Sequence, residues 1–294
     1  MKSLKFVALA CVAALTVGFL AGCATTKTAG TGASFKGPIG LQLYSLRADF
    51  KKDVPGTMAK VGGYGIKYVE LASTYDMAPD KFLALLDANG LKAVSGHFNY
   101  DMYRTNAEEV AHQAQALGLK YAGCAWISHD RNAPFDEKKT REAAAVFNHA
   151  GEVLAAHGIK FFYHTHGYEF QPYQDGTLFD LLMKETDPKL VRYQMDVFWI
   201  VHPGQDPVKL LGKYGNRFEL MHVKDMKAGT EHNLTGGTKD LNNDVQVGTG
   251  IMDWSAILGA AKKAGVKWYF FEDESDAAAQ HIPGSLKYLE AVKF

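Results

Sequence analysis

Residues 156–162 read AHGIKFF, and the same order of helix end, glycine and apolar strand returns at 88–94 (ANGLKAV) and 263–269 (KAGVKWY). Glycine is favoured just past a helix end because it adopts positive φ without strain. Each copy therefore predicts a helix that stops at Gly90, Gly158 or Gly265 and passes directly into a strand. A junction repeated three times indicates a fold built from one helix–strand unit.

Short apolar runs alternate with amphipathic stretches along the rest of the chain. The eight predicted strands are Ile39–Tyr44, Tyr68–Leu71, Ala93–His97, Tyr121–Trp126, Lys160–His164, Arg192–Asp196, Phe218–His222 and Trp268–Glu272. The predicted helices are Val54–Val61, Pro79–Asn89, Ala107–Leu117, Glu137–His157, Leu178–Glu185, Asp206–Lys213, Asp253–Ala264 and Gly284–Val292. Eight strands alternating with helices predict an α/β fold, a single-domain (β/α)8 TIM barrel. The alternative, an open doubly wound sheet, lacks the expected G-x-G-x-x-G turn.

The amino-terminal residues resemble an export signal. Two lysines precede an apolar run at 6–20, and Leu20-Ala21-Gly22-Cys23 is similar to a bacterial lipobox. We expect residues 1–22 to be a lipoprotein signal peptide, Cys23 to be lipidated and residues 23–37 to form a flexible tether before the barrel at 38–294. Ala24, where inner-membrane lipoproteins often carry Asp, favours the periplasmic face of the outer membrane. The alternative is an ordinary signal peptide with an incidental cysteine.

The overall charge argues against nucleic acid as a partner. Lysine plus arginine equal aspartate plus glutamate, 32 against 32, so no basic field is expected. We therefore expect the lipid anchor to be the only contact with a membrane and a small molecule to be the ligand. The sequence leaves the oligomeric state open.

Polar residues gather at the carboxyl ends of the predicted strands, where TIM barrels place their active sites. They are Glu70, His97, Trp126, His164, His166, Asp196, His222, Lys224 and Glu272. Imidazole and carboxylate ligands together suit one divalent ion of Mn²⁺, Mg²⁺, Co²⁺ or Zn²⁺. A hydrogen-bonded polar mouth without an ion is the alternative. The long Gly-, Thr- and Asn-rich segment at 226–252 follows strand seven and predicts a functional loop or lid.

The ordered set of motifs resembles the sugar phosphate isomerase/epimerase superfamily of xylose isomerase-like barrels. The motifs are GLQLYSLR (40–47), KYVELA (67–72), YHTHGYEF (163–170), VRYQMDVFWIVHPGQDP (191–207), ELMHVKD (219–225), VGTGIMDW (247–254) and VKWYFFEDE (266–274). The resemblance implies one divalent ion held by His164, Asp196, His222 and Glu272, and the sequence leaves open whether His166 or Glu169 supplies the strand-five ligand in place of His164. Many relatives carry glutamate at the strand-five position, where this chain has His164. Epimerases of the group pair that glutamate with the strand-eight glutamate as acid and base, so His164 departs from their pattern.

The resemblance implies removal of a proton next to a sugar carbonyl, with the ion stabilising the enolate. Glu272, His166 and Glu169 are the expected catalytic groups; Glu70, His97, Trp126 and Lys224 are expected to contact a small sugar or glycoside. The first expectation is a sugar isomerase or epimerase. An exported member with His164 also suits a 3-keto-glycoside lyase or hydratase that works by β-elimination. A carbohydrate-binding lipoprotein without catalysis is the third alternative.

Overall fold

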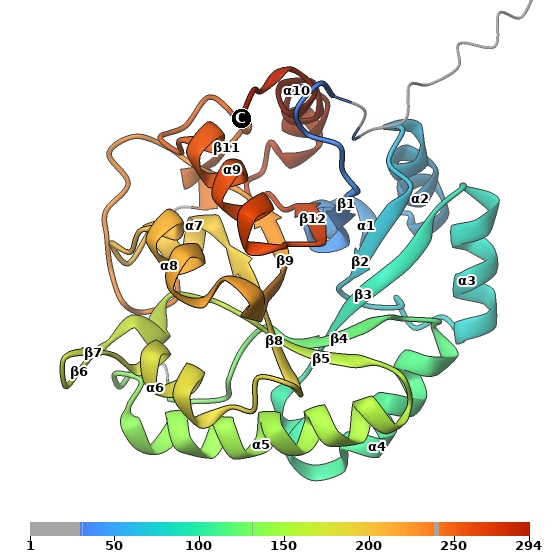
Figure 1. Ribbon diagram of the computed structural model, residues 1–294. Coiled ribbons are helices and arrows are strands. Elements are labelled where there is room, and N and C mark those ends of the chain that lie inside the picture. Colours follow the sequence, from blue (N-terminus) through green and yellow to red (C-terminus); the bar gives the residue numbers. More distant parts are fainter. Residues whose placement is uncertain (1–29, 31, 131, 238–240) are drawn as a thin grey trace, which may run out of the picture.

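Eight parallel strands close into a barrel in the computed structural model, which describes residues 30, 32–130, 132–237 and 241–294 (Figure 1). The strands are β1 (Ile39–Gln42), β2 (Tyr68–Leu71), β3 (Lys92–Phe98), β4 (Tyr121–Cys124), β5 (Lys160–His164), β8 (Val191–Asp196), β9 (Phe218–Val223) and β12 (Trp268–Phe271). They pair in chain order, and β12 returns to β1 with Tyr269 opposite Ile39. The predicted TIM barrel is confirmed.

Helices cover the outside of the barrel between successive strands (Figure 1). They are α1 (Arg47–Phe50), α2 (Val54–Gly63), α3 (Pro79–Ala88), α4 (Tyr100–Ala116), α5 (Glu137–Ala156), α6 (Leu178–Glu185), α7 (Val197–Val201), α8 (Pro207–Tyr214), α9 (Trp254–Ala264) and α10 (Ala278–Ala291). Gly90, Gly158 and Gly265 have φ of +68°, +73° and +84°, so the three repeated junctions turn at glycine as predicted.

Several boundaries differ from those predicted, and the starts of α4 and α10 differ most. α4 starts at Tyr100 instead of Ala107, because Asn99 caps it and a kink at Asn106 joins an additional turn to the predicted helix. α10 starts at Ala278 rather than Gly284, since Pro283 is accommodated inside the helix. β1 ends at Gln42, and a 3-10 turn, Leu43–Leu46, replaces its predicted last residues.

The barrel interior has an apolar lower layer and a polar upper layer. Five buried side chains fill the lower layer: Val94, Tyr121, Phe162, Leu220 and Phe270. A Cβ at Gly123 would lie 2.2 Å from the Phe162 ring, so any larger residue at this position of β4 would clash with the ring. The layer above holds the fully buried Gln42, Glu70, Ser95, Gln194 and His222. The apolar layer closes the barrel beneath the polar one, which is the floor of the candidate site.

The long connection after β9 is held to the top of the barrel by Asp225. Short strands β10 (Asp225–Met226) and β11 (Asp244–Val245) pair antiparallel within it. The Asp225 carboxylate accepts hydrogen bonds from the backbone N–H groups of Gly248, Gly250 and Met252 and from the Trp254 indole. These bonds bring the end of the connection back to α9, at the carboxyl end of the barrel.

The predicted signal peptide and Cys23 lie outside the described residues, as does most of the predicted tether. Within the described part of the chain, no helix combines the length and apolar character that crossing a membrane requires.

Candidate active site

A pocket of about 470 Å³ opens at the carboxyl ends of the strands. Its lining combines the aromatic side chains of Tyr44, Trp126 and Trp199 with imidazole and carboxylate groups. The complete lining is Tyr44, Ala72, His97, Ala125, Trp126, His164, His166, Trp199, Gly236, Gly237, Glu272 and Glu274. Gly236 and Gly237 belong to the connection after β9, so this long segment does reach the pocket, as its position after strand seven predicted.

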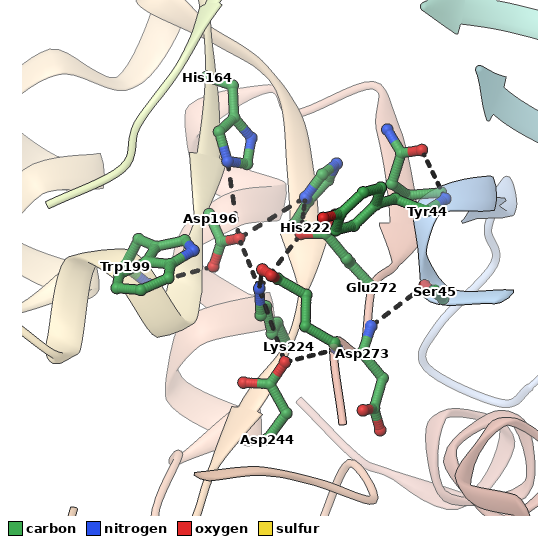
Figure 2. Close-up of polar contacts among 12 residues, drawn as sticks. Tyr44, Ser45, His164, Asp196, Trp199, His222, Lys224, Asp244, Glu272 and Asp273 are labelled. Carbon is green, nitrogen blue, oxygen red and sulfur yellow. Dashed lines mark hydrogen bonds and ion pairs between the residues drawn. The ribbon is translucent and has the colours of Figure 1, made fainter. Parts of the chain in front are cut away.

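Four buried side chains converge at the pocket floor, one from each of β5, β8, β9 and the end of β12 (Figure 2). His164, Asp196, His222 and Glu272 each offer a ligand atom, and all four atoms lie within 4.8 Å of one another. Asp196 Oδ2 is 3.8 Å from His164 Nε2 and 3.6 Å from His222 Nδ1. Glu272 Oε2 is 3.1 Å from His222 Nδ1. These are the four residues that the family resemblance implied as ligands.

Buried hydrogen bonds select the nitrogen that each of the two histidines presents to the cluster. His222 Nε2 lies 2.6 Å from Glu70 Oε1, so it donates to this carboxylate and Nδ1 faces the cluster. His164 Nδ1 lies 2.8 Å from Gln194 Oε1, so it donates there and Nε2 faces Asp196. The Gln194 amide nitrogen donates to Glu70 at 2.9 Å, which fixes the amide orientation. Glu70 therefore orients both rings, one directly and one through Gln194.

The cluster fits a divalent ion. Asp196 Oδ2 is buried and has no hydrogen-bond partner among the described residues, although hydrogen bonding normally satisfies such an atom. Two imidazole nitrogens and two carboxylates form a mixed donor set suited to Zn²⁺, Co²⁺ or Mn²⁺. The second partners of the histidines, Glu70 and Gln194, are of the kind that orients metal-binding imidazoles. The four residues are a candidate metal centre.

Electrostatic interactions keep opposite charges at the cluster. Burial alone would raise the pKa of Glu272, but Lys224 and His222 hold it well below its usual range. Burial alone would lower the pKa of His222, but Glu272 and Glu70 hold it well above its ordinary value. Burial lowers the pKa of His164, and His222 and His97 reinforce the shift. The site therefore contains the Glu272 carboxylate and the neutral His164 imidazole, both able to bind a cation. His222 is charged in the metal-free protein and would release its Nδ1 proton on binding an ion.

Lys224 lies beside the cluster and does not line the pocket. Its ammonium is 3.3 Å from Glu272 Oε2 and 3.8 Å from Asp196 Oδ2 (Figure 2). It also pairs with Asp244 and Glu274. It lies 5.4 Å from the ring centres of both Phe198 and Trp199. Burial opposes its charge, but the surrounding carboxylates raise the pKa of Lys224 well above its ordinary value. Lys224 compensates the acidic cluster, although the sequence suggested a substrate contact.

His166 and Glu169 occupy different positions, although they lie three residues apart. The His166 ring lines the pocket and stacks on Trp199, with ring centres 4.9 Å apart. Burial and the nearby Lys224 lower the pKa of His166 to about 4, so its imidazole is neutral. Glu169 is fully buried outside the pocket lining and accepts the His166 backbone N–H at 2.9 Å. Burial raises the pKa of Glu169 to about 7. Glu169 supports the turn that presents His166.

The other residues predicted to contact substrate also differ in whether they reach the pocket. His97 and Trp126 line the pocket, as expected of residues that contact substrate. Glu70 was grouped with them, but it is fully buried beneath the cluster and accepts bonds from Gln42, Ser95, Gln194 and His222. An acid enclosed by protein donors cannot reach a substrate in the pocket, so its position suits orientation of His222.

Sequence reasoning missed several residues of the pocket and its floor: Tyr44, Trp199, Glu274 and Gln194. Trp199 lies in α7, a single turn that follows Asp196 directly and that the strand–helix pattern did not predict. Gln194 lies two residues before Asp196 on β8, so strand alternation places both on the inner side. That spacing was the available signal for Gln194.

An eight-stranded parallel barrel with an imidazole–carboxylate cluster at its carboxyl end defines a scaffold of a known enzyme superfamily. The chain belongs to the family described as xylose isomerase-like TIM barrel, whose model matches residues 58–294.

Relatives of the chain carry dehydratase and isomerase names. An inosose dehydratase of Lacticaseibacillus casei is 26% identical over 258 residues, which cover 77% of this chain and 85% of that protein. An inosose dehydratase of Geobacillus thermodenitrificans is 28% identical over 157 residues, 51% of this chain and 52% of that protein. The chain thus spans about half the length of this second relative. A solved sugar phosphate isomerase/epimerase from Parabacteroides distasonis is 25% identical with a TM-score of 0.71, covering 85% of this chain and 96% of that one.

Proposed function

We propose that the protein is a divalent-metal-dependent lyase that acts on an uncharged keto sugar or keto cyclitol, or a glycoside of one. It removes the proton next to the carbonyl and expels the β-substituent. The convergence of His164, Asp196, His222 and Glu272 at the pocket floor carries this proposal. The dehydratase names of the relatives favour elimination over the isomerase or epimerase reaction that the sequence suggested first.

The four clustered residues would hold the ion. A bound divalent ion would supply Lewis-acid stabilisation of the negative charge that develops on the substrate carbonyl oxygen. In this arrangement Glu272 serves as a ligand, since its Oε2 faces His222 Nδ1 within the cluster.

His166 is the proposed proton acceptor. Its ring lines the pocket, and because Nδ1 is shielded from solvent, Nε2 is the nitrogen left to face the substrate. Transfer of the α-proton to Nε2 leaves the C–H electron pair to form the new double bond. The β-carbon–oxygen bond then breaks, and the leaving oxygen takes that bond's electron pair and the proton that His166 has accepted, which restores the neutral imidazole. Glu169 positions His166 through its backbone N–H and does not take part in proton transfer.

The pocket suits an uncharged substrate. No lysine or arginine is among the residues that line it, within the described part of the chain. Lys224, the nearby cation, is buried among four carboxylates. Glu272 and Glu274 face the pocket and would repel a phosphate group. Tyr44, Trp126 and Trp199 offer aromatic faces on which the apolar side of a sugar ring can pack.

Isomerisation or epimerisation is the second candidate. It begins with the same proton removal and differs in where the proton returns. The observation that favours it is the presence of two carboxylates, Glu272 and Glu274, at one pocket. Glu274 is paired with Lys224, so it would have to leave this ion pair to act as the second acid or base.

The reaction is tested by incubating protein loaded with Mn²⁺, Co²⁺ or Zn²⁺ in D₂O with free ketoses, a keto cyclitol and 3-keto-glycosides. We expect loss of water or release of the aglycone, with deuterium at the α-carbon of recovered substrate. An epimer or isomer as the sole product would instead support the second candidate. Glu272→Gln should abolish turnover; ligand binding without turnover by any wild-type preparation would support a carbohydrate-binding protein.

We also propose that the protein is exported and anchored through a lipid on Cys23, at the periplasmic face of the outer membrane. The lipobox-like Leu20–Cys23 and the following Ala24 support this placement. Membrane fractionation of the wild type and Cys23→Ser tests it. Equal recovery of both proteins in the soluble fraction would contradict the proposed anchor.

A further inference from the structure

A second group of metal-binding side chains lies on the outside of the barrel, between α4 and α5. Glu108 and His112 lie on α4, four residues apart and therefore on the same side of the helix. His157 is the C-cap residue of α5, which packs beside α4 (Figure 1). β5 begins three residues later, at Lys160, so this group is at the amino-terminal end of the strands, opposite the pocket.

The three side chains already approach one another as ligands would. His157 Nε2 is 2.9 Å from Glu108 Oε2, and the His112 and His157 rings have centres 5.4 Å apart. One ligand atom from each residue lies within 4.8 Å of the other two. Bonds of about 2.1 Å in a tetrahedral site place ligand atoms about 3.4 Å apart. Glu108 and His112 are exposed, so small rotations of their side chains can close the remaining distance.

The chemistry of the group favours a transition metal over Mg²⁺ or Ca²⁺. Two imidazoles and one carboxylate suit Zn²⁺, Cu²⁺ or Ni²⁺, whereas Mg²⁺ and Ca²⁺ prefer oxygen ligands. The carboxyl end of α5 also carries the negative end of the helix dipole, which favours a cation beside His157. An ordinary ion pair needs only Glu108 and His157 and does not account for the edge-to-face approach of His112.

We propose that Glu108, His112 and His157 form a second, surface site for a divalent transition-metal ion, with Zn²⁺ as the probe ligand. The ion would join α4 to the end of α5 and stabilise the fold without taking part in chemistry at the pocket. The proposal does not rest on the proposed function, because it uses residues at the opposite end of the barrel.

Calorimetric titration of the metal-free full chain with Zn²⁺ tests the site. We expect His112→Ala and His157→Ala each to bind one Zn²⁺ fewer than the wild type, or to bind it at least tenfold more weakly. His149→Ala is the matched control, since His149 is an exposed histidine on the same helix α5 and should leave Zn²⁺ binding unchanged. At a hundredfold excess over the wild-type Kd, the ion should raise the Tm of the wild type by about 5–10 °C, and it should raise the Tm of His112→Ala by about half as much or less.

Unchanged stoichiometry and affinity in both His112→Ala and His157→Ala, with the fold intact by circular dichroism, would overturn the proposal. Asp196→Asn separates the two sites, because it should weaken the pocket ion and leave the surface ion bound. If the pocket binds no Zn²⁺, the wild type should show one site that His112→Ala removes, so the surface site stands independently.

Discussion

Gln194→Leu removes the buried amide that connects Glu70 to His164. The amide accepts from His164 Nδ1 at 2.8 Å and donates to Glu70 at 2.9 Å. Leucine keeps a similar side-chain volume but offers neither bond, so the His164 ring loses the partner that holds Nε2 toward Asp196. Loss of such a partner typically weakens metal binding 10- to 100-fold, which corresponds to about 1.4–2.8 kcal/mol.

Ser95→Ala is the matched control for this change. Ser95 is also fully buried and donates to Glu70 at 2.6 Å, but no hydrogen bond joins it to His164 or His222. Each substitution leaves Glu70 with one donor fewer, which should lower the free energy of unfolding by about 1–3 kcal/mol. Gln194→Leu should lower it further, because His164 Nδ1 also loses its acceptor. Only Gln194→Leu should also shift the affinity for the ion, because only Gln194 bonds to a proposed ligand.

Co²⁺ titration followed by visible absorption measures the affinity and the ligand geometry together. Nitrogen-detected NMR of the metal-free protein reports whether His164 carries its proton on Nδ1, as the bond to Gln194 requires. We expect the wild type and Ser95→Ala to share one tautomer and one Co²⁺ spectrum, and Gln194→Leu to alter both. The reasoning is refuted if Gln194→Leu loses stability as Ser95→Ala does but keeps wild-type affinity, spectrum and tautomer.

Three further changes test other parts of the structure. His166→Gln should lower kcat about 10²- to 10⁴-fold in steady-state assays with metal content unchanged; a fall in metal content instead would mark His166 as a ligand. Hydrogen bonds from Lys160, Tyr121 and Lys267 overcome the effect of burial and lower the pKa of Glu219 from 4.5 to about 2. Glu219 therefore stabilises the fold above pH 4.5, and this stability is lost as the pH falls toward 2. Chemical unfolding at several pH values should show that Glu219→Gln makes the free energy of unfolding less dependent on pH between about 4.5 and 2. A pH dependence equal to that of the wild type would count against stabilisation by the hydrogen bonds of Glu219. Gly236 has φ of +67°, and a Cβ there would lie 2.5 Å from Tyr168. Gly236→Ala should therefore raise KM or weaken ligand binding, whereas wild-type kinetics would show that the connection after β9 does not shape the pocket.

Much of the barrel could be predicted because it follows from local patterns. The junctions at Gly90, Gly158 and Gly265 need positive φ, and glycine marks them in the sequence. The cluster could be predicted because each member stands at or just beyond a strand end, where polar residues contrast with the apolar run. His164 and Asp196 are the last residues of β5 and β8, and His222 is the last residue but one of β9.

The sequence could not show which polar side chains lie beneath the cluster and which reach the pocket. Glu70 and Glu272 both occur near strand ends, but Glu70 lies beneath His222 whereas Glu272 reaches the pocket. The difference depends on strand stagger and on which long-range partners surround each carboxylate. Gln194 contacts Glu70, which lies 124 residues away in the chain, and no local pattern specifies such a pair. The role of Lys224 depends in the same way on Asp244, which the connection after β9 brings beside it.

Anomalous X-ray scattering from crystals of the Zn²⁺-loaded protein, measured at the zinc absorption edge, tests the metal centre most directly. The structure predicts a peak within bonding distance of His164 Nε2, Asp196 Oδ2, His222 Nδ1 and the Glu272 carboxylate. The peak should be absent from crystals of Asp196→Asn prepared in the same way. A wild-type map without a peak at these atoms, with the Lys224 ammonium still paired to Asp196 and Glu272, would contradict the proposed centre.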